Sequence, residues 1–380
     1  MSWTPRPELD GPLAGLRVLD FSALLPGPFA TQILADLGAD VVKVERPEGD
    51  EARQFPSGLY ATANRNKRSV VANLKDAADR AACLRLAAEA DVVVEGFRPG
   101  VAARLGIGYD DVRALRADVV YCSLSGFGQT GPYRDKPGHD LTFLALSGGL
   151  SYAAHWGERP RRSGVPVGDM AGATYATIAI LAALRERDRT GRGCYLDAAI
   201  ADATMAFVSP RGGPSFAVAN EHRFGVYATN DLYTAGDGET LAVCAVEEKF
   251  WTRLRGVLAE FAPGLADPRF DSEDGRRRHG DDLKALIQSA LAQRGADLWV
   301  AIFEELDVAV ERVVTLAEAA RSPHAAARGV VAEADGEEQV VFPVLRDGKA
   351  MGRFRSAAPA LGAHTAELLG ELPAANGGAP

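Results

Sequence analysis

Hydrophobic and polar positions follow two alternating periods in the first half of the chain. The short apolar runs Arg17 to Phe21 and Asp40 to Val44 have the length and residue types of buried strands. Between them, the segment from Phe29 to Leu37 carries apolar residues at helical spacing, and Gly38 follows where a helix would end. The order strand, helix, strand predicts a βαβ unit and the beginning of a parallel sheet.

The same alternation continues to about residue 207. Helices are predicted at about Asp76 to Ala90, Val101 to Leu105, Tyr109 to Ala117, Thr174 to Arg187 and Ile200 to Phe207, and strands at Asp91 to Val94, Val119 to Leu124 and within Gly191 to Asp197. This repeated order predicts the α/β class, with a Rossmann-like, doubly wound parallel sheet in a large domain spanning residues 1–205.

The pattern changes after the breaker cluster Ser209 to Pro214, and a linker is predicted at 206–225. Strands at Asp231 to Thr234 and Glu239 to Cys244 flank a glycine turn, and three helices are predicted between residues 248 and 306. These elements predict a smaller α+β domain at 226–329. The charged segment Asp271 to His279 reads as an exposed loop.

Composition narrows the class of protein. A chain of 380 residues fits two domains, and its net charge of −9 argues against a broad nucleic-acid-binding surface. The four cysteines show no C-x-x-C spacing and read as buried thiols in a reducing compartment. The start of the chain lacks the apolar segment of a signal peptide, and the uncharged stretch Met170 to Leu184 falls short of the roughly 20 residues of a membrane span. We expect a cytoplasmic protein without a membrane partner.

Motif searches exclude several cofactor sites. Gly126 to Gly131 matches G-x-G-x-x-G after a predicted strand, but Pro132 follows and no helix begins there. Without a helix N-terminus the pyrophosphate site of a dinucleotide fold is incomplete, so NAD and FAD are not expected. No metal-ligand spacing is present, and neither a metal nor a prosthetic group is predicted.

Basic residues gather near the ends of predicted strands. Arg46 ends one strand, the segment Asn64 to Ser69 precedes another, and Arg98 follows the strand at 91–94. Open α/β sheets bind ligands at the carboxyl ends of their strands. Three basic sites at one sheet in an acidic protein therefore suggest a ligand that carries phosphate.

Three acidic positions and one histidine are candidates for chemistry. His139 and Asp140 precede an apolar helical segment, where Asp140 could be the N-cap. Asp169 follows Gly168 at the start of an uncharged helix, where it could cap the helix or act as a base or nucleophile. Glu247 opens another helix, where the helix dipole favours an acidic residue.

An ordered set of sequence motifs indicates a resemblance to a protein family. It comprises Leu25 to Phe29, Leu37 to Pro47, Asn66 to Ser69, Asn73 to Lys75, Glu95 to Gly100, Ser125 to Pro132, Gly138 to Asp140, Gly168 to Asp169 and Thr190 to Gly193. This set closely resembles the class III CoA-transferase and acyl-CoA racemase family, and the resemblance covers nearly the whole chain. It implies a large domain to which the segment 330–380 returns, a small domain, and an interlocked homodimer whose active site combines the large domain of one chain with the small domain of the other.

The resemblance also implies a ligand and its contacts. Coenzyme A would enter as part of an acyl-CoA substrate, with no prosthetic group on the protein. The implied CoA-binding residues are Arg46, Asn73, Leu74, Lys75, Asp76, Arg98, Arg104, Gly138 and Phe143. The implied catalytic residues are His139, Asp169 and Asp140, with Glu247 orienting His139.

Two chemistries share this family. In the racemase branch, His139 and Asp169 would exchange the α-proton of a 2-methylacyl-CoA, while a backbone N–H of Asp169 or Met170 stabilises the enolate. In the transferase branch, Asp169 would attack the thioester and form an anhydride and then an enzyme-bound CoA thioester. His139 favours an α-methylacyl-CoA racemase, although Val165 stands where racemases often carry Asn. A CoA-transferase is the alternative, and a non-catalytic CoA-thioester binder is a third possibility.

Overall fold

The computed structural model describes residues 3–4, 6–152, 159–213 and 227–370. The chain divides into two compact units. The larger comprises Met1–Leu150, Arg162–Pro210 and Ala320–Pro380, and the smaller comprises Ser151–Arg161 and Arg211–Ala319. The predicted linker at 206–225 lies partly outside the described residues, and the domain boundaries drawn from the sequence stay predictions.

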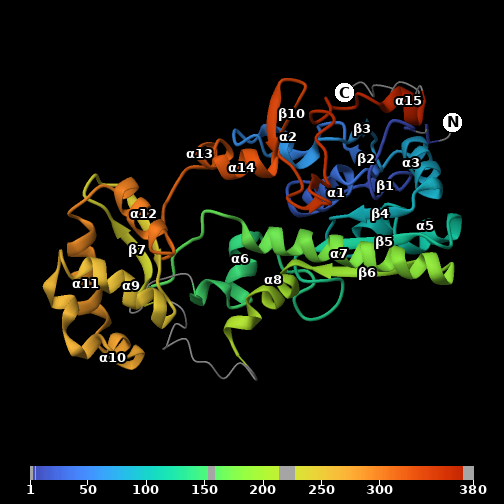
Figure 1. Ribbon diagram of the computed structural model, residues 1–380. Coiled ribbons are helices and arrows are strands. Elements are labelled where there is room, and N and C mark those ends of the chain that lie inside the picture. The colour runs from blue at the N-terminus through green and yellow to red at the C-terminus, as the bar shows by residue number, and fades with distance from the viewer. Residues whose placement is uncertain (1–2, 5, 153–158, 214–226, 371–380) are drawn as a thin grey trace, which may run out of the picture. The chain divides into compact units, whose positions relative to one another are not determined.

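A six-stranded parallel sheet forms the centre of the larger unit (Figure 1). Its strands, in the spatial order β3-β2-β1-β4-β5-β6, are β1 (Arg17–Asp20), β2 (Asp40–Glu45), β3 (Arg68–Val71), β4 (Val92–Glu95), β5 (Val120–Ser125) and β6 (Cys194–Ala199). All neighbouring strands are parallel. The order reverses between β1 and β4, as in doubly wound sheets, so the predicted α/β class is confirmed.

Helices cover both faces of this sheet, because alternate strand residues point to opposite sides. Val93 of β4 belongs to the same buried cluster as Leu86, whereas Val94 packs in the cluster that holds Leu34 and Ile180. The helices of this unit are α1 (Pro26–Asp36), α2 (Leu59–Asn64), α3 (Ala77–Glu89), α4 (Val101–Arg104), α5 (Tyr109–Leu115), α6 (Asp140–Leu146), α7 (Val167–Thr190), α8 (Ile200–Val208), α14 (Pro323–Arg328) and α15 (Thr365–Leu369), with the 3₁₀ turn η1 (Glu51–Gln54). The 3₁₀ turns η2 (Gly149–Tyr152) and η3 (Ser209–Arg211) contain the points at which the chain passes from this unit into the smaller one.

The C-terminal segment packs on the larger unit. It contains the hairpins β10 (Val331–Ala334) with β11 (Glu337–Val340), and β12 (Leu345–Arg346) with β13 (Lys349–Ala350). Gln339 Oε1 accepts a hydrogen bond from Arg65 at 2.9 Å, and the Val71 N–H donates to Thr365 Oγ1 at 3.0 Å. These bonds join residues nearly 300 positions apart and attach the end of the chain beside β3.

The smaller unit has an antiparallel sheet and a helical layer of its own. Its elements are β7 (Asn230–Thr234), β8 (Thr240–Cys244), β9 (Val310–Arg312), α9 (Glu248–Leu258), α10 (Glu273–Arg278), α11 (Gly280–Leu291), α12 (Ala296–Glu305), η6 (Pro263–Ala266) and η7 (Pro268–Phe270), and α13 (Leu316–Ala320) follows at its end. Its core is built around Trp251, Phe270 and Trp299, each almost fully buried.

The charged segment 271–279 contains the helix α10 (Glu273–Arg278), so the predicted loop was wrong. Ser272 caps α10, because its hydroxyl accepts a hydrogen bond from the Gly275 N–H at 3.1 Å. Glu273 pairs with Arg277 one helical turn away at 2.7 Å. A capped turn with such pairs stabilises a short helix in a sequence whose charges alone suggest a solvated loop.

Two further expectations need correction. Helix α7 is longer than predicted and, by length and composition alone, could cross a membrane; half of its most apolar window is buried inside the protein. Buried core helices pass the same test, so this is weak evidence for a membrane span, but the argument from insufficient length was wrong. Among the cysteines, Cys83 and Cys122 are buried, whereas Cys244 is exposed.

Candidate active site

Two cavities open at the carboxyl ends of the parallel strands in the larger unit. The first has a volume of about 350 Å³ and the second about 480 Å³. Ala23 after β1 and Phe97 after β4 line both cavities. The strand order reverses between β1 and β4, which is where open α/β sheets bind ligands.

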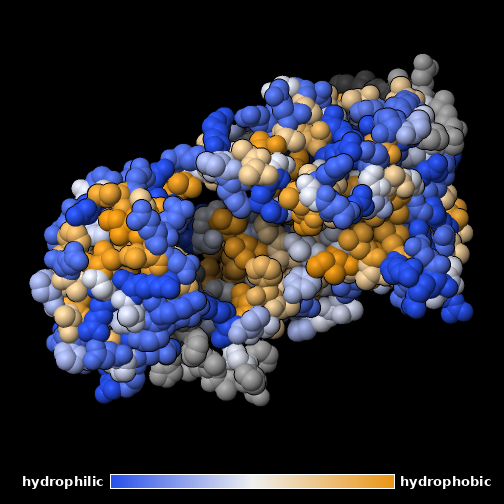
Figure 2. All heavy atoms as spheres, in the orientation of Figure 1, coloured by the Kyte–Doolittle hydropathy of each residue, from blue (hydrophilic) through white to orange (hydrophobic). Residues whose placement is uncertain are grey.

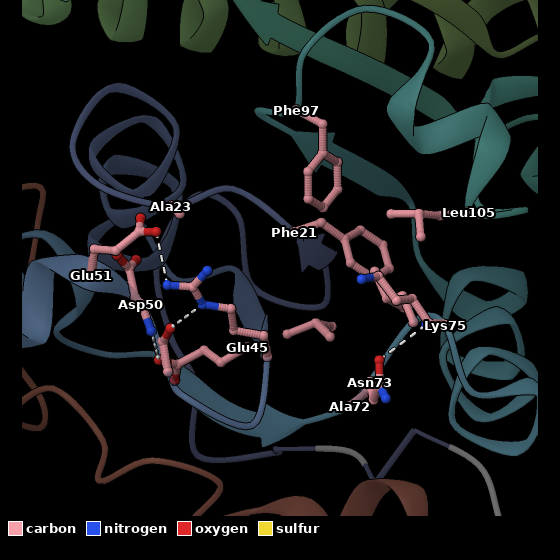
Figure 3. Close-up of a pocket in the computed structure, with 14 residues that line it drawn as sticks. Phe21, Ala23, Glu45, Asp50, Glu51, Ala72, Asn73, Lys75, Phe97 and Leu105 are labelled. Atoms are coloured by element: carbon pink, nitrogen blue, oxygen red, sulfur yellow. Dashed lines mark hydrogen bonds and ion pairs between the residues drawn. The ribbon is translucent and has the colours of Figure 1, made fainter.

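Four of the predicted CoA-binding residues line the first cavity. Figure 3 shows the rings of Phe21 and Phe97 on one side, with acidic residues on the other. Arg46 bonds the Gly49 carbonyl at 3.0 Å and Glu51 at 2.8 Å, and its side chain is 54% exposed. An exposed ion pair of this kind is weak, so a phosphate group of the ligand could replace Glu51 as the partner of the guanidinium. The other three predicted residues here are Asn73, Leu74 and Lys75.

Two predicted CoA contacts lie outside both cavities. Asp76 is the N-cap of α3 and accepts hydrogen bonds from the N–H groups of Ala78 and Asp79 at 2.8 and 3.1 Å. Its carboxylate therefore has a structural role here. Arg104 is exposed and lines neither cavity; its guanidinium lies near Gly100, at 3.2 Å from the position that a Cβ would take there.

The second cavity holds the remaining predicted CoA residues, Arg98, Gly138 and Phe143. In the part of the chain that the structure describes, the exposed Arg98 guanidinium makes no hydrogen bond or ion pair. Phe143 is buried, and a Cβ on Gly138 would lie 2.4 Å from its ring. Only glycine allows this close approach, which brings the chain before His139 against the cavity wall.

Asp169 and His139 line the same second cavity. Asp169 is the third residue of α7, so it is not the cap of that helix. Burial raises the pKa of its carboxyl group to about 7, with the charge of Asp140 as the second cause. Among the described residues, no hydrogen bond or ion pair reaches this carboxylate. A half-buried, unpaired carboxylate that faces a cavity is available as a nucleophile or base.

Asp140 links helices α6 and α7. His139, not Asp140, is the N-cap of α6, so the predicted cap was wrong. Instead, Asp140 Oδ1 accepts hydrogen bonds from the N–H groups of Gly168 at 2.7 Å and Asp169 at 3.2 Å. Asp140 thereby caps the first turn of α7 and fixes the backbone that carries Asp169.

The predicted oxyanion donors are already engaged. The Asp169 N–H donates to Asp140, and the Met170 N–H donates to the Pro166 carbonyl at 3.0 Å. Neither group is free to bind a substrate oxygen in this conformation, so that prediction was wrong. The sequence could not reveal the bond from Asp169, because its acceptor on Asp140 lies 29 residues away along the chain.

His139 and Glu247 lie in different units. The His139 side chain is exposed, and its backbone N–H donates to Thr142 Oγ1 at 2.9 Å at the start of α6. Glu247 is the exposed N-cap residue of α9 in the smaller unit. Its role as an acid that orients His139 stays a prediction.

The basic segment 64–69 lines neither cavity, which corrects one of the three predicted phosphate sites. Arg65, Lys67 and Arg68 are buried and paired with Asp36, Asp20 and Asp40, respectively. Arg134 and Lys136, which line the second cavity, were not predicted. They follow the glycine-rich loop, and their charge was the only available signal. Within the described residues, no group of three or more metal-ligating side chains is present.

Comparison with known proteins identifies the family. The sequence profile of CoA-transferase family III matches residues 13–365, and the chain belongs to this family. It is 35% identical to the acetyl-CoA:oxalate CoA-transferase of Acetobacter aceti, over 98% of this chain and 99% of that one. It is 32% identical to the succinate–glutarate CoA-transferase of Agrobacterium fabrum, over 97% of this chain and 98% of that one.

Solved structures agree with this assignment. A CAIB/BAIF family protein from Brucella suis superposes with a TM-score of 0.85 at 29% identity, covering 94% of this chain and 98% of that chain. A hypothetical protein from Mycobacterium tuberculosis gives a TM-score of 0.81 at 29% identity, covering 95% and 99%. The two relatives named above are CoA-transferases, so the comparisons favour the transferase alternative over the racemase that His139 suggested.

Proposed function

We propose that this protein transfers CoA from an acyl-CoA donor to a free carboxylic acid, with Asp169 as the nucleophile. The observation that carries the proposal is the unpaired carboxylate of Asp169 in the second cavity, whose pKa of about 7 leaves it largely ionised above neutral pH. The names of the relatives support carboxylic acids such as oxalate or glutarate as acceptors.

The chemistry follows from one carboxylate and one thioester. An Asp169 oxygen attacks the thioester carbonyl carbon, the C–S bond breaks, and CoA leaves as a thiolate while a mixed anhydride forms. The thiolate then attacks the Asp169 carbonyl and releases the donor acid, which leaves CoA as a thioester on Asp169. The acceptor carboxylate then attacks the Asp169–CoA thioester, which releases the CoA thiolate and forms a second anhydride. The thiolate attacks the acceptor's carbonyl carbon in this anhydride, which gives the new acyl-CoA and returns Asp169 to a free carboxylate. No proton is gained or lost overall.

The two cavities would hold the donor along the edge of the sheet. Arg46 and Lys75 at the first cavity and Arg98, Arg134 and Lys136 at the second supply positive charge for the phosphates of CoA. The apolar walls formed by Phe21, Phe97 and Leu105 suit the remainder of the molecule. An interlocked homodimer in the cytoplasm remains part of this proposal.

Racemisation of a 2-methylacyl-CoA is a second candidate, because His139 and Asp169 line one cavity. That reaction needs two bases on opposite faces of the α-carbon. A transferase needs only Asp169.

One set of incubations separates these functions. The protein is incubated in deuterated water with 2-methylacyl-CoA, with and without a dicarboxylic acid. A transferase forms a new thioester only with the acid present, and hydroxylamine or borohydride traps a modified Asp169 after acyl-CoA is added. A racemase incorporates α-deuterium without any acceptor and gives no trapped Asp169. The absence of both reactions would leave a CoA-thioester binder and overturn the proposal.

A further inference from the structure

Four buried charges lie beneath the loop that joins β1 to α1. Lys43 pairs with Asp50 at 2.9 Å, and Lys67 pairs with Asp20 at 3.1 Å. Each of these side chains is at most 1% exposed. Lys43, Lys67 and Asp20 line neither cavity, so none of them can contact a ligand there.

The same four charged side chains also form hydrogen bonds with the loop after Phe21 and with the start of α1. The Ser22 N–H donates to Asp20 at 2.9 Å, and the Ser22 carbonyl accepts from Lys43 at 2.7 Å. The Leu24 N–H donates to Asp50 Oδ1 at 3.0 Å. In the first turn of α1, which follows the loop, the Pro28 carbonyl accepts from Lys67 at 2.8 Å. Asp20, Lys43 and Asp50 therefore bond the loop directly, and Lys67 bonds Asp20 and the first turn of α1.

The loop in turn forms part of both cavity walls. Ala23 lines the two cavities, and the residues from Ser22 to Gly27 line the second. Leu24 has a φ of +65°, a left-handed conformation that is unfavourable for a branched side chain. Such a conformation persists only where its surroundings impose it, and the bond to Asp50 does so here.

We propose that Lys43 and Lys67 are positioning residues that hold the loop from Ser22 to Gly27 in the conformation that seats acyl-CoA. The inference rests on the proposed function in taking the two cavities as the CoA-thioester site. Buried ion pairs seldom stabilise a protein more than well-packed apolar residues would. A network that bonds the loop at three points and the first turn of α1 at a fourth is therefore explained by the geometry it imposes on the cavity wall.

The test compares two substitutions that each break a buried ion pair. Lys67→Met removes the partner of Asp20, and Arg65→Met removes the partner of Asp36 in a pair of 2.6 Å that bonds no residue of the loop. Binding of acetyl-CoA is measured by titration calorimetry on folded full-length protein, with circular dichroism as the check on folding. We expect Lys67→Met to weaken binding about tenfold or more, and Arg65→Met to remain within twofold of the wild type.

A milder pair of variants serves if Lys67→Met does not fold. Thr31 Oγ1 donates to Asp20 at 2.5 Å, and Thr177 Oγ1 donates to the Ala173 carbonyl at 2.9 Å. Both side chains are buried, and Val replaces Thr without a change of shape. We expect Thr31→Val to weaken acetyl-CoA binding two- to fivefold and Thr177→Val to leave it unchanged.

Either of two results would overturn the inference. One is wild-type affinity in Thr31→Val and in a folded Lys67→Met; the other is an equal loss of affinity in the two controls, which would show a general effect of destabilisation. Calorimetry measures binding without turnover, so a failure of the positioning role can be distinguished from a failure of the proposed transferase function. A wild-type protein that binds acetyl-CoA but transfers nothing would refute the transferase and leave the positioning role open to the same test.

Discussion

Asp20 and Asp169 are two carboxylates of the larger unit whose surroundings shift their pKa in opposite directions. Burial alone would raise the pKa of Asp20, but Lys67 and Lys43 and the hydroxyls of Ser22 and Thr31 lower it to about 2. Burial raises the pKa of Asp169 to about 7, and Asp140, the second cause, acts in the same direction. The fold therefore pairs the buried carboxylate of Asp20 fully, whereas the carboxylate of Asp169, which lines the second cavity, has no partner among the described residues.

This difference separates a structural charge from a reactive one. The Asp20 oxygens are occupied by hydrogen bonds and a lysine, so they hold the loop and are poor nucleophiles. The Asp169 carboxylate has no such partners among the described residues and faces the cavity. Perturbed carboxylates of the second kind are typical of functional sites.

The largest expected effect is on turnover at the unpaired carboxylate. Asp169→Asn retains the shape of the side chain and the backbone bond to Asp140 but cannot attack a thioester. We expect the rate of CoA transfer to fall at least about a hundredfold, in line with the loss of a positioned catalytic group. Transfer rates and mass spectrometry of the trapped adduct measure this, with acetyl-CoA affinity as the control for intact binding. Normal turnover in this variant would refute the role of Asp169.

Removal of a free cation at the cavity should have the next largest effect. Arg98 lines the second cavity, and a charge-assisted contact to phosphate contributes about 1.5–3 kcal/mol. Arg98→Ala should therefore raise KM for acyl-CoA by one to two orders of magnitude. Arg113→Ala, on the exposed side of α5, is the matched control and should leave KM unchanged. An unchanged KM in Arg98→Ala would show that Arg98 is a surface residue.

The same comparison explains what the sequence could and could not predict. Val18 to Asp20 and Val41 to Val44 are apolar enough to indicate buried strands, and the strand–helix order gave the parallel sheet. His139 and Asp169 could be brought together by family resemblance, and the structure places both on one cavity. The pairing of the charges was not predictable, because Asp20 lies 47 residues from Lys67 along the chain. The bond from the Asp169 N–H to Asp140 was not predictable either, because it spans 29 residues.

Replacing Asp169 or Asp20 by Asn should change the stability of the folded protein in opposite directions at pH 8. The folded-state pKa of Asp169 lies above its unfolded value of about 3.9, so the folded state binds the extra proton between about pH 4 and 7 and loses stability as pH rises through that window. Asp169→Asn removes this cost, so the free energy of unfolding of this variant should exceed that of the wild type at pH 8 and differ little from it at pH 4. Asp20, whose folded-state pKa is lowered, contributes stability above about pH 4, so Asp20→Asn should lower Tm at pH 8.

Thermal unfolding of the variants at pH 4 and pH 8 measures this. A gain of 1 kcal/mol corresponds to about 2–4 °C in Tm for a unit of this size. If Asp169→Asn were destabilised at pH 8 as much as Asp20→Asn, the contrast between an unpaired and a paired carboxylate would be wrong.

The smallest expected effect is a shift in the pH profile caused by Asp140. Transfer requires ionised Asp169, so the transfer rate should rise with pH and level off above a midpoint near 7, the pKa of that group. The negative charge of Asp140 disfavours ionisation of Asp169, although burial is the larger cause. Asp140→Asn removes the charge but keeps a carbonyl oxygen that can accept the hydrogen bonds from Gly168 and Asp169. The midpoint should therefore move to lower pH, and the rate at pH 6 relative to pH 8 should increase severalfold. Asp110→Asn, an exposed acid on α5, should leave the profile in place. A midpoint that stays near 7 in Asp140→Asn would assign the shift to burial alone and limit Asp140 to its role as the cap of α7.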